Sequence, residues 1–180
     1  MPAGPSCAPI EVDGTRLPLA PERDRIHTTT PTFSNLTAVT NPLFPIADLH
    51  SVVQMGTVDN TLASQYHAYL DGRILEVAID WYAQADDGPV WYFGEDAFNC
   101  EDVVVADTHG SWLASRDGPP GMIMPADPAV GDVYRSEIIA GTVFEEVTVR
   151  EVGVPVAGPL GLVDRAIVIR ELHQIGAREN

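Results

Sequence analysis

The chain has 180 residues, with 26 acidic side chains, 10 basic ones and a formal net charge of −16. This charge repels phosphate backbones and anionic lipid surfaces, so we expect neither nucleic acid nor a membrane as a partner. Hydrophobic residues make up 45% of the sequence without any run long enough to cross a bilayer, which favours one globular, soluble domain.

The basic residues are all arginines, so lysine Schiff-base chemistry is excluded. Cys7 and Cys100 stand in no CxxC pattern, and we expect no structural disulfide. The start of the chain lacks a basic region followed by an apolar stretch, which is the pattern of a signal peptide. We therefore expect a cytoplasmic protein.

Residues 1–40 are predicted to form an N-terminal arm, because prolines interrupt it repeatedly and block regular helix and sheet. Two interpretations stay open. The composition favours a disordered tail, whereas the apolar residues Ile10, Leu17, Leu19 and Ile26 favour a lid packed across the mouth of a barrel. The prolines are Pro2, Pro5, Pro9, Pro18, Pro21 and Pro31.

Residues 41–175 are predicted to form the folded domain, followed by a tail at 176–180. Residues 74–84 alternate strictly, with Leu75 and Trp81 on one face and Asp80, Tyr82 and Gln84 on the other, which indicates a strand. Further strands are predicted at 49–55, 65–70, 90–93, 102–107, 111–115, 122–124, 133–139, 142–152 and 166–172. Residues 102–107 and 111–115 are expected to pair as a hairpin around the His109-Gly110 turn.

No window shows the periodicity of an amphipathic helix, so the predicted fold class is all-β. Eight or so short strands separated by turns are typical of a small antiparallel β-barrel of the lipocalin kind. Such a barrel has room for one small ligand.

The five histidines lack the spacing of a metal motif, and no GxSxG, P-loop or GxGxxG pattern occurs. We therefore predict neither a metal nor a cofactor. Asp80, Glu95, Asp96 and Glu137 stand out because they lie in or beside aromatic-rich strands. A carboxylic acid in an apolar interior has a raised pKa and can serve as a general acid or base, although a solvated outer face is the commoner place for any one of them.

Glu137 is the favoured catalytic acid, with Arg135 expected as its charge partner on the same strand face. Tyr82 and Gln84 are the other predicted catalytic residues. The predicted substrate-binding residues are Trp91, Trp112, Met122, Met124 and Tyr134. The alternative for these large side chains is that they simply fill the core.

Several stretches resemble a family of small bacterial β proteins without an assigned activity. Residues 80–84 (DWYAQ) and 90–96 (VWYFGED) match the family pattern, as do residues 110–112 (GSW) with 121–126 (GMIMPA). Residues 41–45 (NPLFP) and 130–137, with the spacing VGDxYRxE, match it as well. The resemblance covers about residues 41–172.

This chain departs from the family pattern in four places. Pro89 replaces the usual asparagine of the turn, and the segment between Phe44 and Asp80 is shorter. Family members usually carry an export signal, and they continue beyond the position of Leu172. These departures favour a shortened cytoplasmic member recruited to a new task.

In size, acidity and expected barrel fold the chain is also similar to the small cyclases of polyketide antibiotic pathways, which include spirotetronate Diels–Alderases and the cyclases of tetronate polyethers. A pericyclic step needs a dry, shaped cavity and a few hydrogen bonds, not a nucleophile. The predicted function is therefore a cofactor-independent cyclase acting on a small hydrophobic, polyketide-like substrate. A lipocalin-like carrier and an interaction domain with a filled core remain alternatives, and a homodimer stays open.

Overall fold

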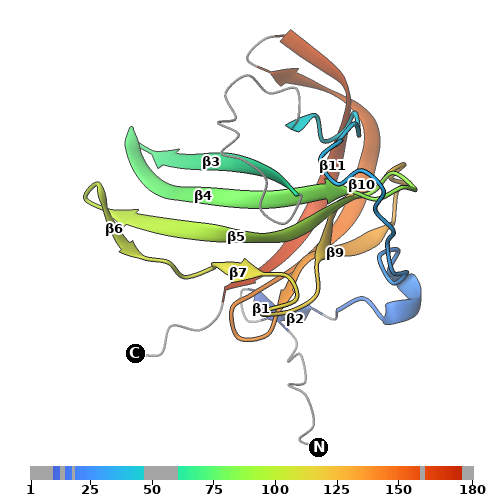
Figure 1. Cartoon of the computed structure of the whole chain (residues 1–180). Helices are drawn as coiled ribbons and strands as arrows, with labels where there is room; N and C mark the ends of the chain where they lie inside the picture. The colour runs from blue at the N-terminus through green and yellow to red at the C-terminus, as the bar shows by residue number, and fades with distance from the viewer. Residues whose placement is uncertain (1–9, 13–14, 18, 47–60, 159–160, 176–180) are drawn as a thin grey trace, which may run out of the picture.

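The computed structural model describes residues 10–12, 15–17, 19–46, 61–158 and 161–175, and these residues form an antiparallel all-β fold (Figure 1). The predicted fold class is thereby confirmed. Within the described residues, no helix is long and apolar enough to cross a membrane. The strands are β1 (Ile10–Val12), β2 (Thr15–Leu17), β3 (Leu62–Leu70), β4 (Arg73–Gln84), β5 (Val90–Glu101), β6 (Val104–Asp107), β7 (Trp112–Leu113), β8 (Gly121–Met124), β9 (Val133–Ile139), β10 (Val143–Gly158) and β11 (Gly161–Ile175), with one 3-10 helix, η1 (Glu22–Asp24).

The strands belong to three sheets. The largest has the order β3-β4-β5-β6, and β7 and β8 also pair with β5. The second has the order β11-β10-β9, and β1 and β2 pair with each other. In the described part of the chain β3 therefore pairs only with β4, and β11 only with β10. Closure of these sheets into a lipocalin-like barrel stays a prediction.

The large sheet is built on two consecutive hairpins. Asp71 and Gly72 have positive φ values of 50° and 75°, the conformation that a tight two-residue turn between β3 and β4 requires. A register shift lies between Trp81 and Tyr82 of β4, opposite Phe93 of β5. Because this bulge reverses the alternation of β5, Tyr92 shares a face with Tyr82.

The two larger sheets meet where β8 passes β9 closely. A Cβ atom on Gly121 of β8 would lie 1.8 Å from the carbonyl oxygen of Ser136 in β9. Only a glycine permits this approach of one backbone to another. The contact joins the sheets along one side, so that β9, β10 and β11 curve across the end of the β4–β5 hairpin (Figure 1).

The predicted hairpin between residues 102–107 and 111–115 is wrong. Residues of β6 and β7 both pair with β5 and not with each other. The physical reason is the length of β5, whose 12 residues offer one edge along which β6, β7 and β8 can pair in succession. The strand predicted at 49–55 lies outside the described residues.

Two buried clusters form the core, and the N-terminal arm packs on both. Phe33 meets Phe93 edge to face with ring centroids 5.5 Å apart, and Val39 is 3% exposed. The part of the arm around Phe33 and Val39 thus packs against the folded domain, as the interpretation of a packed extension expects. The inner cluster comprises Val39, Leu62, Tyr82, Val90, Tyr92, Trp112, Ile139 and Val143. The outer cluster comprises Ala85, Trp91, Met122, Tyr134, Val147 and Val149.

Candidate functional site

Polar side chains form two cross-strand rows, which we name the carboxyl belt. The upper row lies in the large sheet, where Ser64, Asp80, Glu95 and Trp112 are successive partners across β3, β4, β5 and β7. The lower row lies in the second sheet, where Glu137, Glu145 and His173 are successive partners across β9, β10 and β11. Because directly opposite residues point to the same face of a sheet, each row presents its polar groups together.

Trp112 joins the two rows. Its indole N–H donates to Glu137 Oε1 across 2.6 Å, and both side chains are buried. Burial raises the pKa of Glu137 to about 9, and the nearby carboxylates of Glu145, Glu95 and Asp80 add to the effect. The indole bond acts in the opposite direction, because it favours the ionised form. Glu137 is therefore a neutral acid at pH 7.

Asp80 is held by two hydroxyl groups. Tyr92 donates to Asp80 Oδ1 across 2.9 Å, and Ser64 donates to Oδ2 across 3.2 Å. Burial raises the pKa of Asp80 to about 6, although both hydroxyl donors and their hydrogen bonds lower it. Asp80 therefore remains mostly ionised at pH 7, fixed in orientation by its two donors.

Glu95 lies between Asp80 and Trp112 in the upper row. Burial raises its pKa to about 8, and repulsion from Asp80 and Glu76 raises it further. A hydrogen bond with Tyr92 lowers it. Glu95 is thus a second carboxyl that is mainly protonated at pH 7, beside an ionised neighbour.

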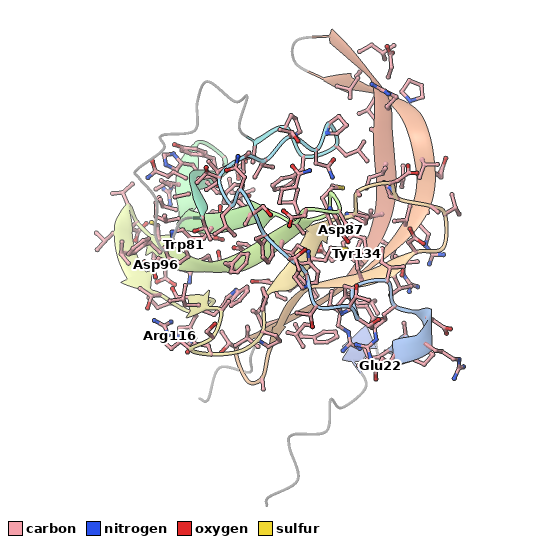
Figure 2. The ribbon with its side chains drawn as sticks, turned by 45° about the vertical axis from the view of Figure 1, so that its right-hand side comes forward. Glu22, Trp81, Asp87, Asp96, Arg116 and Tyr134 are labelled. Carbon is pink, nitrogen blue, oxygen red and sulfur yellow. The ribbon has the colours of Figure 1, made fainter. Side chains whose placement is uncertain are left out.

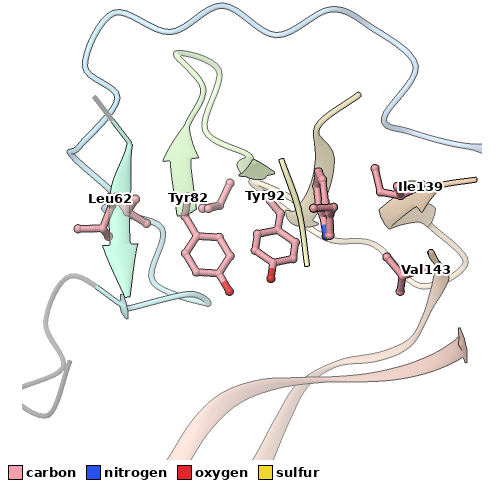
Figure 3. Close-up of a cluster of buried hydrophobic side chains, with 8 residues drawn as sticks. Leu62, Tyr82, Tyr92, Ile139 and Val143 are labelled. Atoms are coloured by element: carbon pink, nitrogen blue, oxygen red, sulfur yellow. The ribbon is translucent and has the colours of Figure 1, made fainter. Parts of the chain in front are cut away.

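Stacked aromatic rings lie beside the belt. Tyr82 and Tyr92 stack with centroids 4.9 Å apart, and Tyr92 meets Trp112 edge to face at 5.3 Å. Phe44, which follows the arm, meets Tyr82 edge to face at 5.1 Å. Figure 3 shows the rings of Tyr82 and Tyr92 side by side, with both hydroxyls pointing away from the arm. Burial raises the pKa of both phenols well above its usual value, so these hydroxyls stay neutral donors.

Glu145 connects the lower row to a bulge and to the last strand. Ser136 donates to Glu145 Oε2 across 2.8 Å, and His173 Nδ1 contacts Oε1 of the same carboxylate. Burial raises the pKa of Glu171, and repulsion from Glu145 acts in the same direction. In the part of the chain that the structure describes, no three such side chains are close enough to hold a metal ion. The acids are spread along the strands and not gathered at one point.

The belt combines two kinds of group that chemistry at neutral pH can use. Glu137 and Glu95 are uncharged acids, which can donate a hydrogen bond or a proton to a carbonyl oxygen. Asp80, with its lower pKa, is an anion that can accept. The rings beside them exclude water, which strengthens each of these interactions.

Four predicted site residues lie in or next to this site. Glu137 and Trp112 belong to the carboxyl belt, Tyr82 belongs to the inner cluster, and Met124 packs against that cluster. Gln84 lies elsewhere, because its Oε1 accepts from the backbone N–H groups of Thr40 and Asn41 and so ties down the arm.

The remaining predicted residues lie on the other side of the sheet. Trp91, Met122 and Tyr134 belong to the outer cluster, against which Phe33 of the arm packs. Figure 2 shows Tyr134 well apart from Trp81, at the side of the molecule where β9 and β10 pass. Asp96 is exposed, as the alternation from Glu95 requires.

The predicted pairing of Glu137 with Arg135 is wrong. Arg135 Nε donates to Glu146 Oε2 across 3.0 Å, in a buried ion pair. The reason is a bulge at Ser136, since Glu137 is opposite Glu145 whereas Arg135 is opposite Glu146. The extra residue places Arg135 and Glu137 on opposite faces of the strand.

Sequence reasoning missed Glu145 and His173 as the neighbours of Glu137. Glu145 lies in the predicted strand 142–152, His173 lies one residue beyond the predicted strand 166–172, and nothing in the sequence aligned either strand's register with β9. One signal was available: Glu145 and Glu146 are consecutive acids within an apolar strand, so one of them has to point inward.

Comparison of the chain with protein-family models, with curated proteins and with solved structures finds no significant match. The resemblance drawn from the sequence motifs therefore stays a prediction.

Proposed function

We propose that this protein is a cofactor-independent cyclase, which holds a hydrophobic, polyketide-like substrate against the carboxyl belt and the aromatic rings beside it. The observation that carries the proposal is Glu137, a buried acid that is neutral at pH 7 and fixed by Trp112. The proposal treats the two curved sheets as the wall of a small lipocalin-like barrel, which acts in the cytoplasm in natural-product biosynthesis.

Glu137 is the proposed catalytic acid. Its carboxyl O–H donates to a carbonyl oxygen of the substrate and withdraws electron density from the conjugated system, which lowers the barrier to an intramolecular cycloaddition or a related rearrangement. The proton stays on Glu137 or returns to it when the ring closes, so the reaction needs neither an oxidant nor a co-reactant. General acid catalysis of this kind typically contributes about 10²–10⁴ in rate.

The aromatic rings supply the second part of the mechanism. Tyr82, Tyr92 and Trp112 pack on one another as a buried aromatic cluster. In this proposal the substrate folds against that cluster, and holding the reacting ends together is itself worth several orders of magnitude in rate. Asp80 fixes the position of Tyr92 by accepting a hydrogen bond from the tyrosine hydroxyl. The predicted residues Trp91, Met122 and Tyr134 support this wall from the outer cluster.

The test is turnover of linear polyketide analogues that carry a diene and an activated alkene, followed by mass spectrometry and chromatography of the products. Wild-type protein is expected to accelerate ring closure, and Glu137→Gln to reduce the rate at least about a hundredfold. The matched control is Glu101→Gln, because Glu101 is an exposed acid on β5.

Two outcomes would contradict the proposal. Equal rates for Glu137→Gln and wild type would remove Glu137 from the chemistry. Analogues that bind and return unchanged would instead favour the carrier of small hydrophobic ligands.

A further inference from the structure

The far end of the β10–β11 hairpin is exposed on both faces. We name it the distal ribbon and define it as Arg150–Gly158 of β10 with 161–171 of β11. No described residue of the ribbon is buried. Its apolar side chains are correspondingly open to solvent, with 66% exposure at Leu162, 53% at Val163 and 42% at Ile169. Figure 1 shows the ribbon curving away from the large sheet.

Such a ribbon is an unusual feature of a folded protein. A two-stranded hairpin is marginally stable by itself, and a third strand or a covering element is normally needed. Among the described residues, β11 pairs only with β10, so one long edge of this 15-residue strand keeps its backbone groups available for pairing. A long apolar edge without a cover is a template for another strand.

The charges of the distal ribbon favour a second copy of this chain as its binding partner. Two copies of a protein with net charge −16 repel each other, yet the ribbon itself is neutral. Its positive residues are Arg150, Arg165 and Arg170, and its negative residues are Glu151, Asp164 and Glu171. The ribbon is therefore a surface on which two copies can meet without net repulsion.

The order of charges along β11 also suits pairing with itself. Antiparallel pairing across a two-fold axis requires that one residue lies opposite its own copy. If that residue is Ile167, counting outward sets Asp164 opposite Arg170 of the other copy, and Arg170 opposite the other Asp164. Val168 then lies opposite Ala166, so the centre is apolar and the ends carry opposite charges.

We propose that the protein forms a homodimer through β11, in which the three-stranded sheets of two copies join edge to edge into one continuous sheet. The pairing supplies hydrogen-bond partners to the edge of β11 that no other described strand pairs with. This inference does not depend on the proposed cyclase activity.

The first test is the oligomeric state by sedimentation velocity, from about 1 to about 100 μM protein, a range that covers the dissociation constants of ordinary dimers. A dimer is expected for the wild type. Val168→Glu places two like charges next to the axis and is expected to weaken association at least about tenfold. The matched control is Tyr66→Glu on β3, which among the described strands pairs only with β4 and whose tyrosine is 52% exposed.

The second test is a charge exchange. Asp164→Arg alone and Arg170→Asp alone each set like charges opposite each other twice, and each is expected to weaken the dimer about tenfold. The double variant restores opposite charges and is expected to restore association. Thermal unfolding of each variant checks that the subunit is intact.

Three results would overturn the proposal. The first is a monomer over the whole concentration range. The second is a dimer that Tyr66→Glu splits and Val168→Glu does not. The third is a double charge variant that associates no better than either single one.

Discussion

Glu137 determines how the stability of the fold depends on pH. Its pKa is raised from 4.5 to about 9, so in this interval the folded chain keeps a proton that the unfolded chain releases. The free energy of unfolding therefore falls as the pH rises through this interval. Glu95, whose pKa is raised to about 8, acts in the same direction.

Glu137→Gln removes this titration and retains an oxygen for the indole N–H of Trp112. We expect the free energy of unfolding of the variant to approach that of the wild type at about pH 3, well below the ordinary pKa of 4.5, where the acid is neutral in both states. At pH 8.5 the variant is expected to exceed the wild type by at least about 1 kcal/mol. Urea unfolding at the two pH values measures the difference. The control is Glu101→Gln, at an exposed position, which should leave the pH dependence of stability unchanged. If the free energies of unfolding of Glu137→Gln and wild type change with pH in the same way, the prediction is contradicted.

The buried hydrogen bond from Tyr92 to Asp80 is expected to stabilise the fold. Tyr92→Phe removes a donor from a buried carboxylate and is expected to lower the free energy of unfolding at pH 7.5 by about 1–3 kcal/mol. Tyr82→Phe is the matched control, because Tyr82 stacks on the same ring and has no hydrogen bond to Asp80. Equal losses for both variants, measured by thermal unfolding, would show that the hydroxyl of Tyr92 contributes nothing specific.

At the scale of the elements, the close approach of β8 to β9 connects the two sheets. Gly121→Ala would place a methyl group 1.8 Å from the carbonyl oxygen of Ser136, and two backbones must then separate. We expect a loss of at least about 3 kcal/mol, beyond the usual range for a point substitution. Gly118→Ala is the control, because its nearest contact, at 2.6 Å, is the terminal methyl of Ile139, which can rotate away. A Gly121→Ala protein as stable as Gly118→Ala would contradict this view of the junction.

The strands themselves were largely predictable, whereas the direction in which they face was not. Alternation identified β4 and its two faces, yet the more apolar face is the outer one: Leu75 is 43% exposed and Asp80 only 6%. Periodicity separates two faces but does not tell which of them another sheet covers. The bulges at Phe93 and Ser136 place Tyr92 and Arg135 on the opposite faces from those that strict alternation predicts, because one extra residue reverses the alternation. The sequence pattern did not indicate either bulge.

At the scale of the whole molecule, the candidate site depends on how two sheets meet. Asp80, Glu95 and Glu137 were each recognisable as acids among aromatic residues, and the fold does bring them together. Their partners Glu145 and His173 could not be placed beside Glu137 from the sequence, because they join the row only through the registers of β10 and β11. Gln84 and Trp91 are predicted site residues because of their neighbours in the sequence. Gln84 Oε1 instead accepts a backbone hydrogen bond from Asn41, and Trp91 belongs to the outer cluster, against which Phe33 packs.

Both the proposed chemistry and the pH dependence of stability follow from the protonation state of Glu137. The most direct measurement is the infrared carbonyl band of a buried carboxylic acid, recorded as a difference between wild type and Glu137→Gln from pH 5 to pH 10. We predict a band that persists at pH 7 and disappears with a midpoint near the pKa of about 9. A band already lost by pH 6 would show that Glu137 is ionised in the folded protein, and would contradict its role as a neutral donor.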